Sequence, residues 1–228
     1  MNKPNPKNVF KTLFPENGIL SEQEIYAIKS NSQIITHNKK DILFKQDNLT
    51  SHIIFLKSGL VKLTKEIRNN RSLILKISTP GQFIGIISQF GSGANEYTAT
   101  AIDDCEVYYI DVNVFNSILE SNGKYAMYII NIVCNENINI FNRIILQNQK
   151  QLPGKLADII LYFSEEIYHS ESFEFPLTRT ELAELASTTK ESFIRTLTEF
   201  KNDKIIRIEN KSIEITSFEI LKTLSRIG

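Results

Sequence analysis

Four polar side chains between residues 190 and 195 have the types and the spacing that suit hydrogen bonding to the edges of bases. They are Lys190, Glu191, Ser192 and Arg195. If a helix begins at Lys190, these side chains lie on its exposed N-terminal half. Lys and Arg donate to guanine O6 and N7, and a carboxylate accepts from cytosine N4. The segment therefore has the chemistry of a helix that enters the major groove.

Local signals predict two short helices that would position these side chains. The first is expected from about Arg179 to about residue 186, because Thr178 and Glu181 form the pattern of a capping box. The second is expected from about residue 190 to about residue 202, with Thr188 or Thr189 as its N-cap. Each helix has an apolar stripe, made by Leu182 and Leu185 in the first and by Phe193, Leu197 and Phe200 in the second.

An alternating segment follows the second helix and predicts a hairpin. Residues 205–208 and 212–215 would be its strands, with residues 209–211 as the turn. Two helices followed by a hairpin predict a winged helix-turn-helix. The alternative is an ordinary packed unit of two helices and a hairpin with no affinity for nucleic acid.

The charge of this region argues against a broad basic surface. The whole chain has a net charge of zero, and residues 151–228 contain 10 Lys and Arg against 13 Asp and Glu, a net charge of −3. Phosphate contact would then depend on a few placed cations, for which we expect Arg179, Lys190, Lys201, Lys204 and Lys211. The predicted DNA-binding residues are Lys190, Glu191, Ser192, Arg195, Arg179, Thr189 and Lys211.

Short apolar or alternating runs recur from about residue 34 to residue 110. Turn signals rich in Gly, Asn, Asp and Pro separate them. This pattern predicts a β-sandwich or a barrel-like roll. The expected strands are residues 42–44, 52–56, 59–65, 72–77, 83–87, 97–102 and 106–110.

A helical period begins after residue 111 and predicts a long helix over residues 124–149. Apolar residues recur along it at spacings of three and four, close to the seam of a coiled coil. One side of so apolar a helix can rest on the strands, and the other can meet a second copy in a parallel dimer. The alternative is a helix buried within its own monomer. The expected dimer interface is Met127, Ile130, Cys134, Asn137, Phe141 and Ile144, with Asn137 helping to fix the register.

The predicted fold class is α+β, with three parts in sequence. Residues 1–123 form an N-terminal β-roll of the jelly-roll type that senses an effector, with flanking helices such as residues 21–30. Residues 124–150 form the dimerisation helix, and residues 151–228 form the winged helix-turn-helix. Pro153 and Gly154 suit a hinge at residues 151–154, followed by a helix over residues 155–168.

Several function classes lack support in the sequence. No apolar stretch approaches the ~20 residues of a membrane span, and the N-terminus does not resemble a signal peptide, so we expect a cytoplasmic protein. We find no Gly-rich phosphate loop, nucleophile motif or metal-ligand spacing, so we expect neither an enzyme nor a metal site. Cys105 and Cys134 are too few for a disulfide framework.

The order of these parts resembles the Crp/Fnr family of bacterial transcription regulators, and the resemblance covers nearly the whole chain. Four segments carry it, namely residues 57–63 (KSGLVKL), 80–85 (PGQFIG), 154–157 (GKLA) and 177–195 (LTRTELA leading to TKESFIR). By resemblance, Glu191 and Arg195 match base-reading positions of the family. Lys190 stands where members that bind cyclic AMP have Arg, and Ile194 departs from members with Ser.

The departures from the family concern its effectors. Members that bind cyclic AMP have Glu after Gly, to hold the ribose, and an Arg further on for the phosphate, whereas here Gly85 is followed by Ile86 and the later segment reads Asn95-Glu96-Tyr97-Thr98. A buried phosphate without a cation is costly to desolvate. We therefore expect no gating by cyclic AMP in the usual way. Relatives with an iron–sulfur cluster use N-terminal cysteines, and residues 1–104 contain none.

An effector, if there is one, is expected between the roll and the long helix, and a small uncharged or weakly polar ligand would suit it. The alternative is a pocket filled by its own side chains in a constitutively active dimer. No cofactor is predicted; haem through His37 or His52, and a redox role for Cys134, compete with ordinary structural roles. The expected effector residues are Gly85, Ile86, Asn95, Tyr97, Thr98, Ile140 and Phe141.

Together these features predict a dimeric, sequence-specific transcription regulator. Its expected partners are double-stranded DNA with a two-fold symmetric site, a second copy of the chain, and RNA polymerase. The alternative is a β-roll ligand sensor that acts through protein contacts, with a helix-turn-helix that no longer binds DNA. Target genes, the operator sequence, and activation versus repression do not follow from the sequence.

Overall fold

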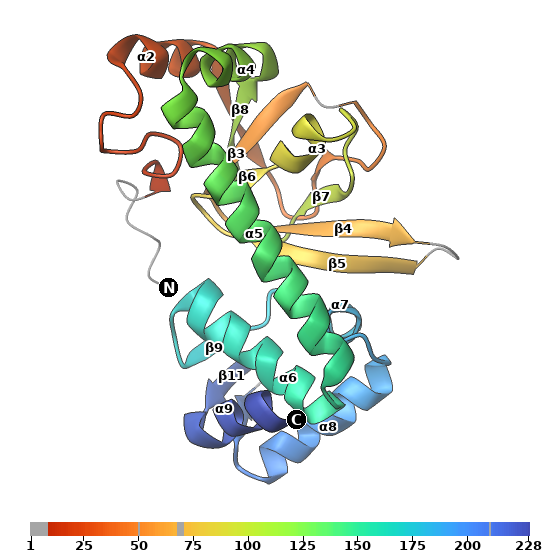
Figure 1. Cartoon of the computed structure of the whole chain (residues 1–228). Coiled ribbons are helices and arrows are strands. Elements are labelled where there is room, and N and C mark those ends of the chain that lie inside the picture. Colours follow the sequence, from red (N-terminus) through yellow and green to blue (C-terminus); the bar gives the residue numbers. More distant parts are fainter. Residues whose placement is uncertain (1–8, 50, 68–70, 210) are drawn as a thin grey trace. The chain divides into compact units, whose positions relative to one another are not determined.

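The structure, a computed structural model, describes residues 9–49, 51–67, 71–209 and 211–228. It divides into two compact units, an N-terminal unit that ends at Asn139 and a C-terminal unit, Ile140–Gly228. The division falls within the long helix α5 (Gly123–Gln149) (Figure 1). No helix in the described part of the chain is long and apolar enough to cross a bilayer.

The N-terminal unit contains two four-stranded antiparallel sheets. One has the strand order β1-β8-β3-β6 and the other β2-β7-β4-β5. This arrangement confirms the predicted β-roll. The strands are β1 (Ser32–His37), β2 (Ile42–Phe44), β3 (His52–Ser58), β4 (Val61–Ile67), β5 (Arg71–Ser78), β6 (Phe83–Ile84), β7 (Thr98–Ala101) and β8 (Cys105–Asp111).

Strand β3 is buried on both faces, and its alternating side chains belong to two cores. Ile54 and Leu56 pack between the two sheets with residues of β4, β7 and β8. Ile53 and Phe55 pack on the opposite face against helices, including Phe115 of α4. Because side chains of a strand alternate between faces, one continuous apolar run supplies both cores.

Within the described residues, the helices that accompany the roll include α2 (Glu22–Ser30), α3 (Ile86–Phe90), α4 (Val112–Ser121) and the first part of α5. Ser21 and Glu24 form the capping box of α2, as predicted. Asp111 ends β8 and caps α4 by accepting from the amides of Asn113 and Val114. Tyr125 and Ile129 of α5 are buried in the core that the helices form with the sheet.

The C-terminal unit confirms the winged helix-turn-helix. Its sheet has the strand order β10-β11-β9, which adds one strand to the predicted hairpin. The C-terminal helix packs against the first complete helix of the unit and buries Leu221. The elements are α6 (Leu152–Leu161), the π-helix η1 (Tyr162–Tyr168), β9 (Ser172–Glu174), α7 (Arg179–Leu185), α8 (Lys190–Asn202), β10 (Ile206–Glu209), β11 (Ser212–Ile215) and α9 (Phe218–Ile227).

Two local predictions are wrong. The strand expected over residues 83–87 ends at Ile84, because Gly85 takes a left-handed conformation (φ 86°) and α3 begins after it. The helix expected from residue 155 begins at Leu152, with Gln151 as its N-cap. Pro153 lies in the first turn, where a missing N–H breaks no helical hydrogen bond, so it begins this helix instead of interrupting it.

Residues around the junction between α5 and α6, where the sequence predicts a hinge at residues 151–154, make close contacts with one another. The ammonium of Lys150 donates to both carboxylate oxygens of Asp158, at 2.8 and 2.7 Å. Ser225 of α9 donates to the same carboxylate at 2.5 Å. Gly154 faces Gly228, and a Cβ on Gly154 would lie 2.8 Å from the carbonyl carbon of Gly228. Gly154 is therefore a site of close packing between α6 and the end of α9.

Candidate nucleic-acid interface and effector region

Helix α8 has one buried face and one exposed face. Phe193, Leu197 and Phe200 are buried against the rest of the C-terminal unit, as predicted. The exposed side chains include Lys190, Glu191 and Arg195, so the structure brings these three predicted reading residues together on the first turns of the helix. Ile194, which precedes Arg195, is 40% exposed and adds an apolar side chain to the same surface.

Thr189 caps α8, as the sequence predicts. Its hydroxyl oxygen accepts from the amide of Ser192 at 3.2 Å and donates to the Ser192 hydroxyl at 3.1 Å. These two predicted DNA-binding residues therefore also hold the helix N-terminus in place. Each hydroxyl retains a lone pair for a further donor.

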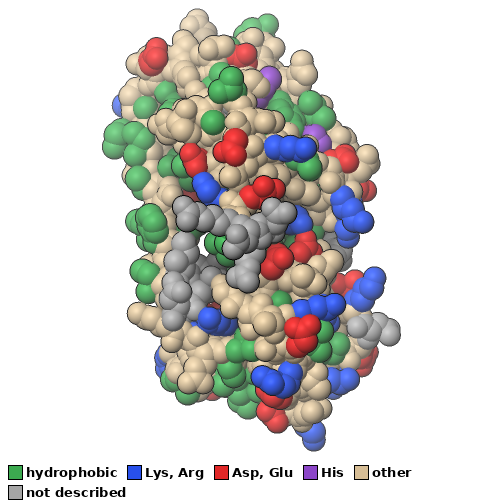
Figure 2. Space-filling view, turned by 90° about the vertical axis from the view of Figure 1, so that its right-hand side faces the viewer, with side chains coloured by type: hydrophobic (Ala, Val, Ile, Leu, Met, Phe, Trp, Pro, Cys, Tyr) green, Lys and Arg blue, Asp and Glu red, His purple; other side chains and the backbone are tan. Residues whose placement is uncertain are grey.

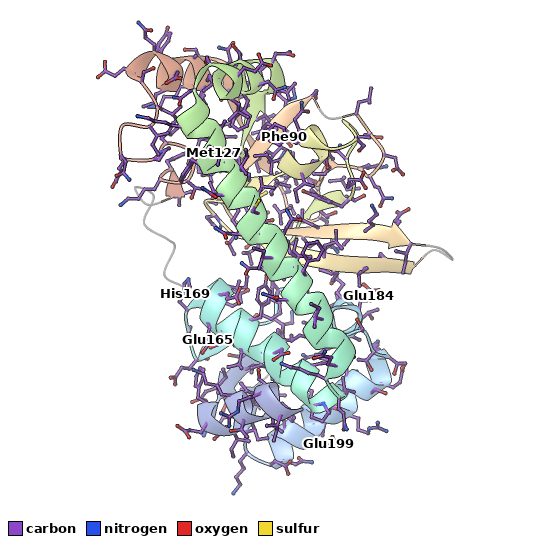
Figure 3. All side chains as sticks on the ribbon, in the orientation of Figure 1. Phe90, Met127, Glu165, His169, Glu184 and Glu199 are labelled. Atoms are coloured by element: carbon purple, nitrogen blue, oxygen red, sulfur yellow. The ribbon has the colours of Figure 1, made fainter. Side chains whose placement is uncertain are left out.

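Arg195 has an intramolecular partner that was missed at the level of sequence. Its Nε lies 4.0 Å from Oε1 of Glu199, one turn later on α8. Glu199 is labelled in Figure 3. Both side chains are mostly exposed, so solvent screens this attraction strongly. The spacing of four residues could have revealed the pair.

Arg179 is less exposed than we expected from the sequence. It is the first residue of α7, and its guanidinium lies over the ring of Phe175, 5.7 Å from the centroid. The side chain is only partly accessible, and this burial lowers the pKa of Arg179. Phe175 lies four residues before Arg179 but outside α7, so their spacing in the sequence did not predict this contact.

Several acidic residues of the C-terminal unit have partners within the unit. Asp158 pairs with Lys150, Glu165 with Lys222, and Glu214 with Arg207. Glu181 is part of the capping box of α7. Four exposed lysines, in contrast, make no ion pair with a described residue: Lys190, Lys201, Lys204 and Lys211.

The distribution of charge agrees with the sequence count. The surface of the C-terminal unit, at the bottom of Figure 2, carries basic and acidic side chains interspersed on this face. Lys211 is exposed at the start of β11 in the wing, next to Asn210, which lies outside the described residues. No uniformly basic face is visible in this view.

In the effector region, the side chain of Tyr97 reaches the backbone at Gly85. The Tyr97 hydroxyl accepts a hydrogen bond from the Gly85 amide at 2.9 Å. Burial raises the pKa of Tyr97 to about 12; the Gly85 amide opposes this rise and the Glu136 carboxylate adds to it. Ile86 and Asn95 are buried as well. These predicted pocket residues therefore pack within the roll.

The segment in which the sequence lacks a phosphate-binding Arg, residues 95–98, contains an acidic group. Glu96 accepts from Lys65 at 2.7 Å and from Ser92 at 3.0 Å, and these contacts lower its pKa. Thr98 accepts from the amide of Gln46 at 3.0 Å. The remaining predicted pocket residues, Ile140 and Phe141, belong to the C-terminal unit, so their place above the pocket stays a prediction.

A charged pair near Tyr97 had no signal in the sequence. Lys76 of β5 and Glu136 of α5 form an ion pair at 3.2 Å, and their side chains are only 13% and 19% exposed. Sixty residues separate them, so only the fold brings them together. The region is consequently more polar than the apolar pocket that the sequence predicts.

One face of α5 is apolar and exposed. Among the predicted interface residues, Met127 (Figure 3), Ile130 and Phe141 are 57%, 50% and 62% exposed. Cys134 is also exposed, and Asn137 donates to the carbonyl of Val133 in its own helix at 2.7 Å. The side chain of Ile144 lies outside the described residues. Ile138 and Ile145 extend the exposed face.

The histidines and cysteines have ordinary surroundings. His37 Nε2 lies 2.9 Å from the Tyr109 hydroxyl, and His52 Nδ1 lies 2.9 Å from the Ser51 hydroxyl. Cys105 is buried, and burial raises the pKa of its thiol to about 11. Over the described part of the chain, His, Cys, Asp and Glu do not gather in any group of three that could hold a metal ion.

Two family models match the chain, in the order in which the two units occur. The model of the cyclic nucleotide-binding domain matches residues 34–122. The model of the Crp-like helix-turn-helix domain matches residues 154–224. Each match lies within one of the two compact units.

Over most of its length the chain is similar in sequence to bacterial regulators. The chain is 21% identical over 206 residues to the CRP-like cAMP-activated global transcriptional regulator of Mycobacterium tuberculosis, which covers 89% of this chain and 92% of that protein. It is 21% identical over 200 residues to the nitrogen fixation regulation protein FixK of Bradyrhizobium diazoefficiens, with 86% and 83% covered.

Solved structures show the same fold. FixK2 from Bradyrhizobium japonicum has a TM-score of 0.76 at 17% identity, covering 85% of this chain and 96% of that one. A protein from Eubacterium rectale, described as a transcriptional regulator of the crp/fnr family, has a TM-score of 0.77 at 18% identity, with 93% and 98% covered. At these identities the likeness establishes the fold alone.

Proposed function

The chain belongs to the Crp/Fnr family of transcription regulators, and we propose that it is a homodimeric, sequence-specific DNA-binding regulator that reads the major groove with α8. The observation that carries the proposal is the two-faced structure of this helix. Its apolar residues hold it in the unit, while Lys190, Glu191 and Arg195 are exposed together near its N-terminus. These are the groups that guanine and cytosine edges require.

Further contacts would orient the protein on the backbone. The exposed Lys201, Lys204 and Lys211 have no ion pair with a described residue, so no internal contact must break before they meet phosphate. Thr189, Ser192 and Arg179 complete the interface. Because the net charge of residues 151–228 is −3, attraction to phosphate would depend on these individually placed cations.

The dimer would form through the exposed apolar face of α5. Ile130, Cys134 and Phe141 recur on it at heptad-like spacing, and apolar side chains so exposed on a helix favour a partner helix. A parallel pair would place two copies of α8 about one turn of DNA, ~34 Å, apart. A two-fold symmetric operator follows from this symmetry.

Regulation is proposed to be independent of cyclic AMP in the usual mode and of an iron–sulfur cluster. Tyr97 bonds to Gly85, Ile86 stands in place of a ribose-binding carboxylate, and Glu96 would repel a phosphate. If an effector binds the roll, it is a small molecule without a phosphate. The regulator named above from Mycobacterium tuberculosis is cAMP-activated, so this difference can be measured directly by titrating cyclic AMP in a calorimeter.

The three parts of the chain would have separate roles. Residues 1–123 would sense an effector, residues 124–150 would form the dimer, and residues 151–228 would bind DNA. The protein would act in the cytoplasm as a regulator and not as an enzyme, with RNA polymerase as a further partner.

A second candidate is a ligand sensor that acts through protein contacts and does not bind DNA. The net charge of −3 over residues 151–228 favours it. The exposed reading residues of α8 argue against it, since a helix that had lost this role would have no need of them together.

Arg195→Ala tests the reading role of α8. Operators are first recovered with the wild-type protein from genomic fragments, and binding is then measured to the operator and to each of its single-base variants. We expect a loss of about 1–3 kcal/mol and relaxed specificity at one position of each half-site. A loss that is uniform across all sequences would make Arg195 a phosphate contact. No binding of the wild-type protein to any DNA would favour the second candidate.

A further inference from the structure

A cluster of aromatic rings lies beneath Arg179 in the C-terminal unit. Phe163 of η1 stacks on Phe173 of β9, with ring centroids 6.1 Å apart, and Tyr168 stacks on Phe173 at 5.6 Å. Phe175 meets the rings of Phe163 and Phe173 edge to face, at 5.1 and 5.5 Å. Because Phe163 and Phe173 are buried, these contacts hold the Phe175 ring in one orientation.

Arg179 lies on the face of the Phe175 ring. The carbon at the centre of its guanidinium is 5.7 Å from the ring centroid, a cation–π distance. Nη1 of Arg179 is buried, and it has no hydrogen-bond partner among the described residues. The same burial lowers the pKa of the Arg179 guanidinium.

These observations describe a cation that is held in place but lacks acceptors. A guanidinium N–H without an acceptor is unfavourable, and a negatively charged oxygen relieves this cost best. The planar fork of Arg suits a phosphate, and stacking on an aromatic ring leaves its in-plane N–H groups to make the hydrogen bonds. Lys has neither the plane nor the fork, so it would not replace Arg at this position.

We propose that Phe175 is a positioning residue for a DNA-backbone contact made by Arg179. The aromatic cluster fixes the ring, the ring holds the guanidinium at the start of α7, and a phosphodiester oxygen supplies the missing acceptor after a small movement of the Arg179 side chain. This inference rests on the proposed DNA-binding function, and it assigns a role to an aromatic side chain that does not itself touch DNA.

The test is a double-mutant cycle on binding to the operator, with Phe175→Leu, Arg179→Lys and the two combined. Phe175→Leu is expected to weaken binding by the dimer about tenfold, since two cation–π contacts are lost per dimer. Arg179→Lys should weaken it at least as much, because Lys lacks the planar fork that binds phosphate. The double variant should bind no more weakly than Arg179→Lys alone. Losses that multiply, or wild-type affinity in Phe175→Leu, would overturn the proposal.

Two controls separate positioning from a general loss of structure. Phe175→Tyr keeps the ring and should bind DNA as the wild type does. If any change at residue 175 simply disturbed the structure, Phe175→Tyr and Phe175→Leu would both bind more weakly. The losses from Phe175→Leu and Arg195→Ala should multiply, because Arg195 lies on α8 and acts independently. Thermal unfolding of each variant confirms that binding is measured on folded protein.

A measurement without DNA distinguishes failure of this inference from failure of the proposed function. The NMR signals of the Arg179 side chain should be displaced by the ring current of Phe175 in the free wild-type protein. They should move to ordinary positions in Phe175→Leu. If they are the same in both proteins, Phe175 does not hold Arg179, whatever the outcome of DNA binding. If the ring current is present but no DNA binds, the proposed function fails instead.

Discussion

The hydroxyl of Tyr97 accepts a hydrogen bond from the backbone amide of Gly85 at 2.9 Å. Gly85 has a left-handed backbone (φ 86°) and no side chain, and its amide points into the roll, where Tyr97 is buried. The side chain of Tyr97 thereby satisfies a donor that a bound ligand could otherwise use. This contact is the main structural reason to expect that the roll is filled by its own residues.

Tyr97→Phe should destabilise the N-terminal unit. The variant keeps the ring but leaves the Gly85 amide without its acceptor, a loss of about 1–3 kcal/mol in the free energy of unfolding. Urea unfolding measures the change. Tyr26→Phe is the matched control, because Tyr26 is 72% exposed and should lose almost nothing. Equal stability of both variants would mean that water replaces the tyrosine hydroxyl and that the region is open to solvent.

The buried tyrosines should also make the protein sensitive to alkali. Burial raises the pKa values of Tyr97 and Tyr109 from 10.0 to about 12. Between these values the unfolded chain has lost protons that the folded chain keeps, so the free energy of unfolding falls as the pH rises. This stability is fully present below about pH 10 and is lost as the pH rises through about 12. Urea unfolding from about pH 10 upward should show that the free energy of unfolding falls less steeply with pH in Tyr97→Phe than in the wild type.

The ion pair of Lys76 and Glu136 should matter more than an exposed pair. Glu136→Leu leaves Lys76 largely buried without its partner, and the expected loss of stability is about 2 kcal/mol. Adding Lys76→Met should restore most of it, because no unpaired charge then remains. Lys65→Met removes an exposed pair with Glu96 and should cost less than about 1 kcal/mol. Similar losses in Glu136→Leu and Lys65→Met would show that solvent reaches the Lys76 pair.

Gly154→Ala should destabilise the C-terminal unit. The added Cβ would lie 2.8 Å from the backbone of Gly228, and such overpacking costs about 1–3 kcal/mol. Gly123→Ala is the control, since its Cβ would meet nothing within 4 Å. A Gly154→Ala variant with unchanged stability but altered DNA affinity would instead support a hinge at this glycine.

Charges placed in the exposed face of α5 should separate the dimer. The double variant Ile130→Glu, Phe141→Glu would bring four carboxylates into the proposed seam of two helices, where they repel one another and lose water. Light scattering should give the mass of a dimer for the wild type and of a monomer for the variant. Tyr26→Glu, outside this face, should stay dimeric. A double variant that remains a dimer would place the interface elsewhere.

Local sequence signals located the helix-turn-helix closely. The capping box of Thr178 and Glu181 and the N-cap Thr189 each involve residues three apart or fewer, so their effect does not depend on the fold. Helix α9 has comparable signals, with Ser217 as N-cap and Glu219 in its first turn. Strand β9 is three residues long and too short to be recognised by its pattern.

Long-range contacts could not be predicted from the sequence. Lys76 and Glu136 look like solvated charges until the fold brings β5 against α5. Pro153 and Gly154 resemble a flexible linker, because the close approach of Gly228 to Gly154 depends on how α6 packs against α9. Arg179 could be recognised as a cation near a helix start, but the ring beneath it depends on the packing of η1 and β9.

Selection of genomic fragments with the purified protein tests whether this chain reads DNA as a dimer. We expect enrichment of a two-fold symmetric sequence whose half-sites lie about one helical turn, ~34 Å, apart. The same selection with Arg195→Ala should yield a motif with one relaxed position in each half-site. No enrichment with the wild-type protein, or enrichment of single half-sites without symmetry, would contradict the claim that this chain is a dimeric reader of DNA.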